Sequence, residues 1–285
     1  MYYDSHTHLN SPELFPKYEE LLANFIKIWW KKLVNVWVDK ERTQRALEIQ
    51  KNYPEYCLST VWFHPSEVIF KRKWNKFLFW KETLFWDEFL QAIENYIREL
   101  VENKLVIAIW ECWLDYHYTE KDGGKLSKDS IEKQKELFIL QCKLAQEYDI
   151  PLVIHSRDAF EDSVEILKDF KELKIYFHCW GYWPEEIKII VDLFPNLWVG
   201  FDWNITYKKA DNLRESIKLL PFEKVLLETD APYLTPQIVR KEKNQPANIK
   251  YIYEYVSNLL NIPELELQKI IEENFYNYYF WELRT

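Results

Sequence analysis

The chain has 285 residues, of which 48% are hydrophobic and 29% are charged, a composition typical of a soluble globular protein. Its formal net charge of -9 argues against a broad basic surface that coats duplex DNA, but it leaves room for a local basic rim. No apolar run is long enough to span a bilayer and the first residues lack a secretory signal, so we expect a cytoplasmic protein without membrane contact.

Short apolar or β-branched runs alternate with longer stretches of helical periodicity. Strands are predicted at residues 2–5, 33–38, 57–62, 105–110, 152–155, 174–178, 196–201 and 224–229. Helices are predicted at residues 17–30, 40–51, 87–103, 130–148, 158–170, 184–193, 208–219, 246–260 and 263–280. This alternation predicts an α/β protein with a parallel sheet closed into a TIM-type (β/α)8 barrel, in a single domain over residues 1–285.

Most histidines and two acids follow the ends of these predicted strands. They are His6 and His8 after the first, then His64, Glu111, His155, His178 and Asp230 after later ones. Because barrel enzymes keep their active sites at the carboxyl ends of the strands, we expect a metal site there.

The spacing of these residues predicts two groups of ligands. His6 and His8 are two residues apart and should face the same side of a strand. Asp230 follows the last strand, which neighbours the first in a closed barrel, so it can complete their site; alternatively it caps a helix. His155 and His178 end neighbouring strands and can share a second ion.

Glu111 lies between the two groups, and its two oxygens can bridge two cations. A pair of cations about 3.5–4 Å apart activates a water and clamps a phosphoryl oxygen. Imidazole and carboxylate ligands suit Zn²⁺ or Mn²⁺ best, with Mg²⁺ possible, whereas a structural zinc would favour cysteines.

Further residues are candidates for binding substrate. His64 can contact a phosphate or act as an acid, or it can hold a metal ligand in place. Arg157 can form a fork to a phosphate or a surface salt bridge. The aromatic and lysine-rich segment 66–86 is interpreted as a packed loop rather than a base-stacking surface. Two interpretations stay open for a further group of basic residues: they form a basic rim around the site, or they are ordinary solvent-exposed charges. These residues are Lys208, Lys209, Arg240, Lys241 and Lys243.

Cysteine and tryptophan usage leads to two further expectations. The four cysteines show no CxxC spacing and are expected to be reduced, with Cys112 and Cys179 pointing away from the site because strand side chains alternate. The chain has 4 glycines and 14 tryptophans, whereas ordinary usage of roughly 7% predicts about 20 glycines. Tryptophans stand where turns favour glycine at positions 37, 62, 110, 113, 203 and 281.

We hypothesise that the gene reads UGA as glycine and that these positions, decoded here as tryptophan, are glycines. The alternative is a naturally tryptophan-rich protein. UGG codons at Trp62, Trp110 and Trp203 would refute the hypothesis.

The chain resembles the TatD family of metal-dependent deoxyribonucleases over nearly its whole length. The similarity rests on motifs in this order: Asp4-Ser5-His6-Thr7-His8, Trp110-Glu111-Cys112-Trp113-Leu114-Asp115-Tyr116, His155-Ser156-Arg157-Asp158-Ala159, Phe177-His178-Cys179 and Glu228-Thr229-Asp230-Ala231-Pro232-Tyr233. Tryptophan occupies both glycine places of the second motif, and Asn244-Gln245-Pro246 departs from the family's usual N-E-P. The resemblance implies that His6, His8 and Asp230 bind one divalent ion, that His155 and His178 bind another, and that Glu111 bridges them.

The resemblance also implies exonuclease action on DNA, on single strands or 3′ ends. In this interpretation Asp230 accepts a proton from the attacking water, and Arg157 and His64 steady the phosphate. An amidohydrolase acting on a small C–N bond is the first alternative, although such enzymes often have a lysine where this chain has Glu111. The others are removal of D-amino acids from tRNA, and an inactive binding barrel if tryptophan truly fills the glycine positions. The oligomeric state stays open.

Overall fold

The computed structural model describes residues 1–28, 30–36, 40–60, 86–117 and 126–280, with the backbone alone for residues 30, 40, 110, 111 and 113. Its strands are β1 (Tyr2–Thr7), β2 (Trp30–Asn35), β3 (Cys57–Ser59), β4 (Ile109–Asp115), β5 (Leu152–Arg157), β6 (Ile175–Phe177), β7 (Leu197–Phe201) and β8 (Val225–Leu227). Neighbouring strands pair in parallel and in chain order, from β1 to β3 and from β4 to β8.

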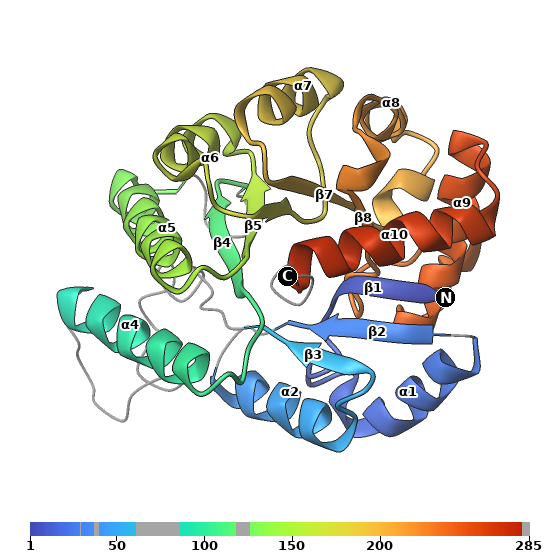
Figure 1. Cartoon of the computed structure of the whole chain (residues 1–285), viewed down its shortest axis with the longest axis horizontal. Coiled ribbons are helices and arrows are strands. Elements are labelled where there is room, and N and C mark those ends of the chain that lie inside the picture. Colours follow the sequence, from blue (N-terminus) through green and yellow to red (C-terminus); the bar gives the residue numbers. More distant parts are fainter. Residues whose placement is uncertain (29, 37–39, 61–85, 118–125, 281–285) are drawn as a thin grey trace.

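Hydrogen bonds join these two groups of strands at both seams. At one seam Thr7 and Ala231 form a parallel bridge, the His8 amide donates to the Ala231 carbonyl at 2.7 Å, and the Asp230 amide donates to the His6 carbonyl at 2.9 Å. At the other seam the Ile107 amide donates to the Ser59 carbonyl at 3.0 Å. The strands therefore close into the predicted barrel, and helices surround it (Figure 1).

The described α-helices agree with the predicted ones within a few residues at each end. They are α1 (Tyr18–Lys27), α2 (Lys40–Asn52), α4 (Trp86–Glu102), α5 (Lys128–Tyr148), α6 (Phe160–Leu167), α7 (Pro184–Leu193), α8 (Asp211–Leu219), α9 (Ile249–Leu260) and α10 (Glu264–Tyr279). Short 3₁₀ helices are η1 (Phe15–Lys17), η4 (Lys168–Phe170), η5 (Trp203–Thr206), η6 (Phe222–Lys224), η7 (Gln237–Val239) and η8 (Pro246–Asn248). None of the described helices has the length and apolar character needed to cross a membrane.

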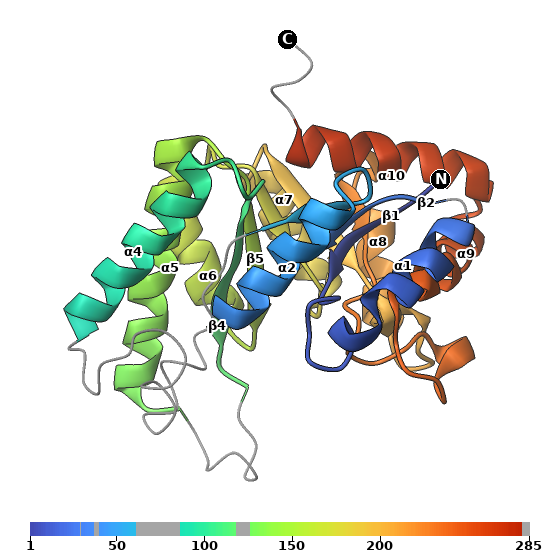
Figure 2. The ribbon, with the colours of Figure 1, turned by 90° about the horizontal axis from the view of Figure 1, so that it is seen from below.

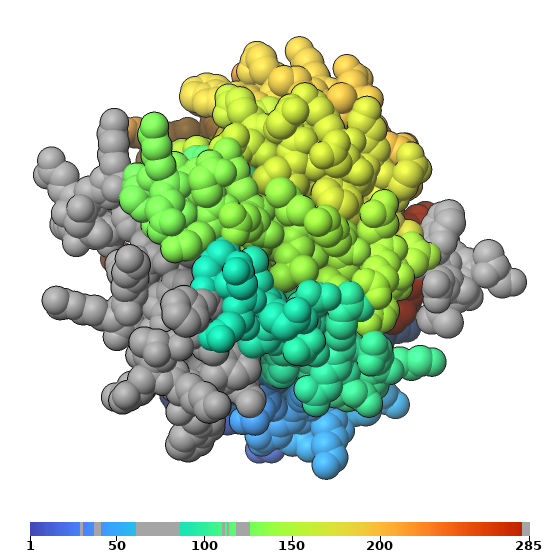
Figure 3. All heavy atoms as spheres, turned by 90° about the vertical axis from the view of Figure 1, so that its left-hand side faces the viewer, coloured from blue at the N-terminus to red at the C-terminus, as the bar shows by residue number. Residues whose placement is uncertain are grey.

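The outer helices form because each presents one apolar face to the strands. In α4 the buried side chains recur every three or four residues, which is the period of a helix, at Phe89, Ile93, Ile97 and Leu100. Helix α5 lies beside α4 on the surface (Figure 3). Arg98 of α4 donates to both carboxylate oxygens of Glu147 of α5 at 2.5 and 2.8 Å.

Helix α10 covers the end of the barrel at which the strands begin (Figure 2). Its Asn274 amide donates to the carbonyls of Phe222 and Val225 at 2.7 and 2.8 Å, and its Tyr279 hydroxyl donates to the Ser5 carbonyl at 3.1 Å. With this end closed, the opposite end, where the strands finish, is the one open to a ligand.

The predicted strand at residues 105–110 was wrong in its boundaries. The structure begins β4 at Ile109 and continues it to Asp115, so Glu111 lies inside the strand rather than after it. Leu105, the first residue of the predicted strand, instead completes the end of α4. Lys104 has a φ of 54°, and the amides of Lys104 and Leu105 donate to the carbonyls of Val101 and Leu100. This is the Schellman arrangement that ends many helices.

Candidate active site

His6, His8 and Asp230 form one cluster at the seam between β1 and β8. The Nε2 atoms of His6 and His8 lie 3.0 Å apart, and Asp230 Oδ1 lies 3.1 Å from the first and 3.3 Å from the second. The two histidines share a face because they are two residues apart along an extended strand. All three side chains are buried or nearly so. Imidazole nitrogens and a carboxylate converging on one point are ligands that suit a divalent transition metal.

His155 and His178 form a second cluster beside the first. His155 lies in β5 and His178 follows β6, and their Nδ1 and Nε2 atoms are 2.9 Å apart. The ring centroids of His178 and His6 are 4.2 Å apart, so the two clusters are contiguous. The structure thus brings together five of the predicted site residues.

The electrostatics of the first cluster favour the forms that bind a metal. Burial lowers the pKa of His6 well below its ordinary value, so its imidazole is neutral at neutral pH. Burial acts to raise the pKa of Asp230, but the neighbouring His6 and His8 outweigh it and hold this pKa below the ordinary value. A neutral imidazole and an ionised carboxylate are the protonation states required of ligands.

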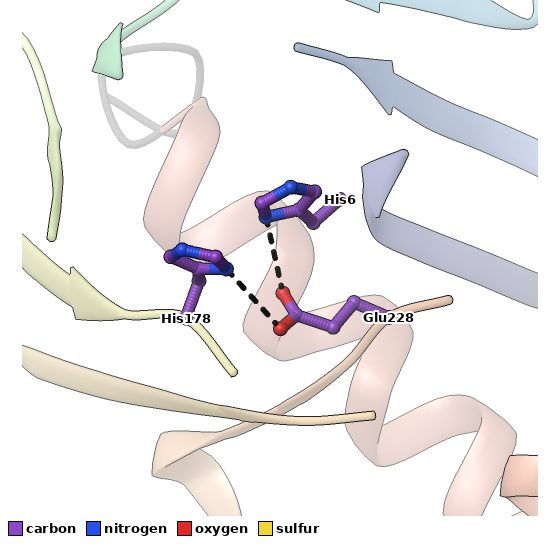
Figure 4. A group of neighbouring side chains, drawn as sticks. All are labelled: His6, His178 and Glu228. Atoms are coloured by element: carbon purple, nitrogen blue, oxygen red, sulfur yellow. Dashed lines mark ion pairs between the residues drawn. The ribbon is translucent and has the colours of Figure 1, made fainter. Parts of the chain in front are cut away.

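A buried carboxylate, Glu228, lies beside His6 and His178, one histidine of each cluster (Figure 4). Its Oε2 is 3.8 Å from His6 Nδ1, and its Oε1 is 3.6 Å from His178 Nδ1. The Tyr176 hydroxyl donates to Oε2, and the Cys179 amide donates to Oε1 at 2.6 Å. Glu228 therefore contacts one histidine of each pair on the side of the ring away from the cluster.

The clusters open into a cavity of about 840 Å³, which is within the usual size range of small-molecule sites. The exposed Arg157 lines it, as do the exposed Tyr233 and Leu234. On the β4 side, His117 Nδ1 lies 2.7 Å from Asp158 Oδ2 and Asp115 Oδ2 lies 4.0 Å from His155 Nε2. The cavity thus joins the two histidine clusters to a lining that carries an arginine, two acids (Asp115 and Asp158) and exposed apolar side chains.

Two of the predicted site residues cannot be placed at this centre. For Glu111 the structure gives the backbone position in β4 but not the side chain. His64 and residues 66–85 of the aromatic segment lie outside the described residues. The predicted roles of Glu111 and His64 therefore stay predictions.

The basic residues after β7 and β8 lie next to one another. The Arg240 guanidinium stacks over the Tyr207 ring, 5.1 Å from its centroid. Tyr207 directly precedes Lys208 and Lys209, and Arg240 directly precedes Lys241, so this contact brings the two basic segments together. All of these basic side chains are exposed. Glu242 is exposed among them as well, so the basic rim stays a prediction.

The prediction that Cys179 points away from the site was wrong. Cys179 lines the cavity, and its sulfur lies within 4.8 Å of carboxylate oxygens of Asp202 and Asp230. The reason is that Cys179 follows β6 with a φ of 46°, so strand alternation no longer applies to it. Cys112 inside β4 is fully buried, and all four cysteines are free.

Among the six tryptophans proposed to be glycines, Trp203 is the one whose side chain is described. It is absent from the described residues with positive φ, so its backbone does not require glycine. Its ring packs 5.3 Å from that of Tyr207, and its buried indole nitrogen has no hydrogen-bond partner. A buried donor without a partner is unfavourable. The decoding hypothesis stays a prediction.

Sequence reasoning missed Asp115, His117 and Asp158. A signal for two of them was present, because Asp115 and His117 are separated from Glu111 by even numbers of residues along the β4 strand and its continuation. Residues at such spacing face the same side of a strand. Burial raises the pKa of Asp115, as expected for a carboxylate enclosed beside a site.

Comparison with known proteins adds independent findings. The family model described as TatD related DNase matches residues 3–280. The uncharacterized metal-dependent hydrolase YabD of Bacillus subtilis is 30% identical over 276 residues, which cover 96% of this chain and 97% of that protein. The 3′-5′ ssDNA/RNA exonuclease TatD of Pantoea ananatis is 29% identical over 223 residues, covering 76% and 75%. The crystal structure of YjjV, a TatD homolog from Escherichia coli K12, superposes with a TM-score of 0.79 at 22% identity and covers 98% and 97%.

Proposed function

The chain belongs to the family of TatD-related DNases and is a metal-dependent hydrolase, and on this premise we propose that it cleaves phosphodiester bonds of single-stranded DNA from the 3′ end. The observation that carries the proposal is the contact between two ligand clusters at the open end of the barrel, His6 with His8 and Asp230, and His155 with His178. A relative named as a 3′-5′ exonuclease supports the choice of substrate.

In this proposal His6, His8 and Asp230 hold one divalent ion, and His155 and His178 hold another. Glu111 bridges the two ions, as the family resemblance implies. Such a pair supplies an activated water and stabilises the charge that develops on phosphoryl oxygens. Zn²⁺, Mn²⁺ and Mg²⁺ are the candidates, given the mixed nitrogen and oxygen donors.

The side chains around the centre bind the substrate and move the proton. The ionised Asp230 carboxylate, which faces the cavity, accepts the proton that the attacking water loses. Arg157 at the rim pairs with a phosphate of the strand. Tyr233, which is 52% exposed and packs edge-on against His8 at 5.3 Å, offers a ring on which a terminal base can stack.

The direct test is incubation of a 5′-labelled single strand with the metal-loaded chain. We expect a ladder that shortens from the 3′ end with Mn²⁺ or Mg²⁺, and no cleavage after chelation. Glu111→Ala should abolish turnover and reduce the metal content, whereas Lys168→Ala, on the outer surface next to Glu165, should change neither. Absence of cleavage with any of the three metals would favour amidohydrolase chemistry, and full activity of Glu111→Ala would refute the bridging role.

A further inference from the structure

The carboxylate of Glu228 lies next to one histidine of each ligand cluster. Oε2 lies 3.8 Å from His6 Nδ1 and Oε1 lies 3.6 Å from His178 Nδ1. Figure 4 draws both pairs. The opposite nitrogen of each ring belongs to a cluster: His6 Nε2 lies beside His8 and Asp230, and His178 Nε2 lies beside His155. One carboxylate thus faces the rear of one ligand from each site.

Glu228 is held so firmly that it can fix the orientation of its neighbours. Its side chain is fully buried and receives hydrogen bonds from the Tyr176 hydroxyl and the Cys179 amide, one on each oxygen. Tyr176 is itself fully buried and packs edge-on against Tyr278 with ring centroids 5.5 Å apart. The carboxylate plane therefore has little freedom to rotate.

The other acids of the site do not share this arrangement. Asp115 faces the ring of His155 at 4.0 Å, which concerns the second cluster alone. Asp4 accepts hydrogen bonds from the Thr229 amide and hydroxyl and from the His6 backbone amide. These bonds involve no imidazole ring. Within the described part of the chain, Glu228 is the acid that faces outer ring nitrogens from both clusters.

A histidine that binds a metal through one ring nitrogen usually presents the other N–H to a carboxylate, which fixes the tautomer and the ring orientation. We propose that Glu228 is a positioning residue shared by both metal sites: it holds His6 and His178 with Nδ1 protonated and Nε2 aimed at the two ions. This inference rests on the two-ion centre of the proposed function. It predicts that one substitution weakens two sites.

The test is calorimetric titration of Mn²⁺ into the metal-stripped full chain, read as two affinities rather than as activity. Glu228→Gln keeps the size of the side chain but replaces one carboxylate oxygen by an NH₂ group, which donates hydrogen bonds and cannot accept them. We expect it to weaken the binding of both ions by about 10–100-fold. His8→Ala and His155→Ala are the comparators, and each should weaken mainly the ion of its own cluster.

A control at a second buried acid separates positioning from the mere loss of a buried carboxyl group. Asp202 is fully buried, and one of its oxygens accepts from the Asn204 amide at 2.8 Å. Asp202→Asn removes the carboxyl group of a nearby buried acid whose pKa is raised by burial, and we expect it to leave both affinities within about threefold of the wild type. An equal loss in Asp202→Asn and Glu228→Gln would overturn the proposal.

Other outcomes are equally decisive. Unchanged affinities in Glu228→Gln would refute the positioning role, and loss of a single ion would make Glu228 a residue of one site. If Glu228→Gln fails to fold, Tyr176→Phe, which removes only the anchoring hydroxyl, should still weaken both ions several-fold; unchanged affinities there would overturn the proposal. A wild-type chain that binds fewer than two ions would refute the two-ion premise, and thus the proposed function, before any variant is compared.

Discussion

Replacing Gly200 with alanine would place a methyl group against the ring of Tyr176. A Cβ at this position of β7 would lie 2.4 Å from the Tyr176 hydroxyl oxygen and 2.8 and 2.9 Å from two of its ring carbons, whereas ordinary contacts are 3.4–4 Å. The ring would have to move by roughly an ångström, yet it is fully buried and its hydroxyl is bonded to Glu228. Overpacking of this kind costs about 1–3 kcal/mol.

We therefore expect Gly200→Ala to lower the free energy of unfolding in urea by about 1–3 kcal/mol, and to weaken metal binding because the moved ring displaces Glu228. Gly181→Ala is the matched control. A Cβ there would meet its nearest atom, the Cys179 carbonyl oxygen, at 3.9 Å, so stability should be unchanged within about 0.5 kcal/mol. The reasoning fails if Gly200→Ala is as stable as the control and binds Mn²⁺ with wild-type affinity.

Three further outcomes are expected. Because burial lowers the pKa of His6, the unfolded chain binds a proton below about pH 6.5 that the folded chain does not. The wild type should therefore lose about 1 kcal/mol of stability relative to His6→Asn between about pH 6.5 and 5.5, and an equal loss of stability in both proteins in urea unfolding would contradict this. Ser127→Ala removes the oxygen that accepts from the Ser130 amide at the start of α5 and should cost about 0.5–2 kcal/mol in the same assay, unlike Ser127→Asn. Chelation should lower the melting temperature, since an ion at 100 times its Kd stabilises by about 2.7 kcal/mol; an unchanged temperature would argue against tightly held metal.

The order of helices and strands could be predicted because the hydrophobic periodicity agrees with the residues that begin and end these elements. Helix α7 matches its predicted bounds, since a proline at its first residue and an apolar face mark it clearly. The start of β4 could not be predicted, because Leu105 is apolar like a strand residue, yet its backbone amide closes the end of α4 and it does not enter the sheet.

The grouping of His6 with Asp230 could also be predicted, because closure of a barrel makes the first and last strands neighbours. The orientation of the His6 and His178 rings could not be predicted, because the spacing of residues 6, 178 and 228 does not tell which ring nitrogen faces which carboxylate oxygen. The position of Cys179 was missed for a related reason: a left-handed backbone after β6 reverses the direction that alternation assigns.

The seam between β1 and β8 has a consequence for the order of events in the cell. Asp4 and Thr229, whose hydrogen bonds tie the seam, are 225 positions apart. At translation rates of about 5–20 residues per second, roughly 10 to 45 s pass between their synthesis. During that interval the amino-terminal histidines are already outside the ribosome while their aspartate has not been made. Binding of the proposed ion by all three residues of the first cluster must therefore follow the synthesis of Asp230.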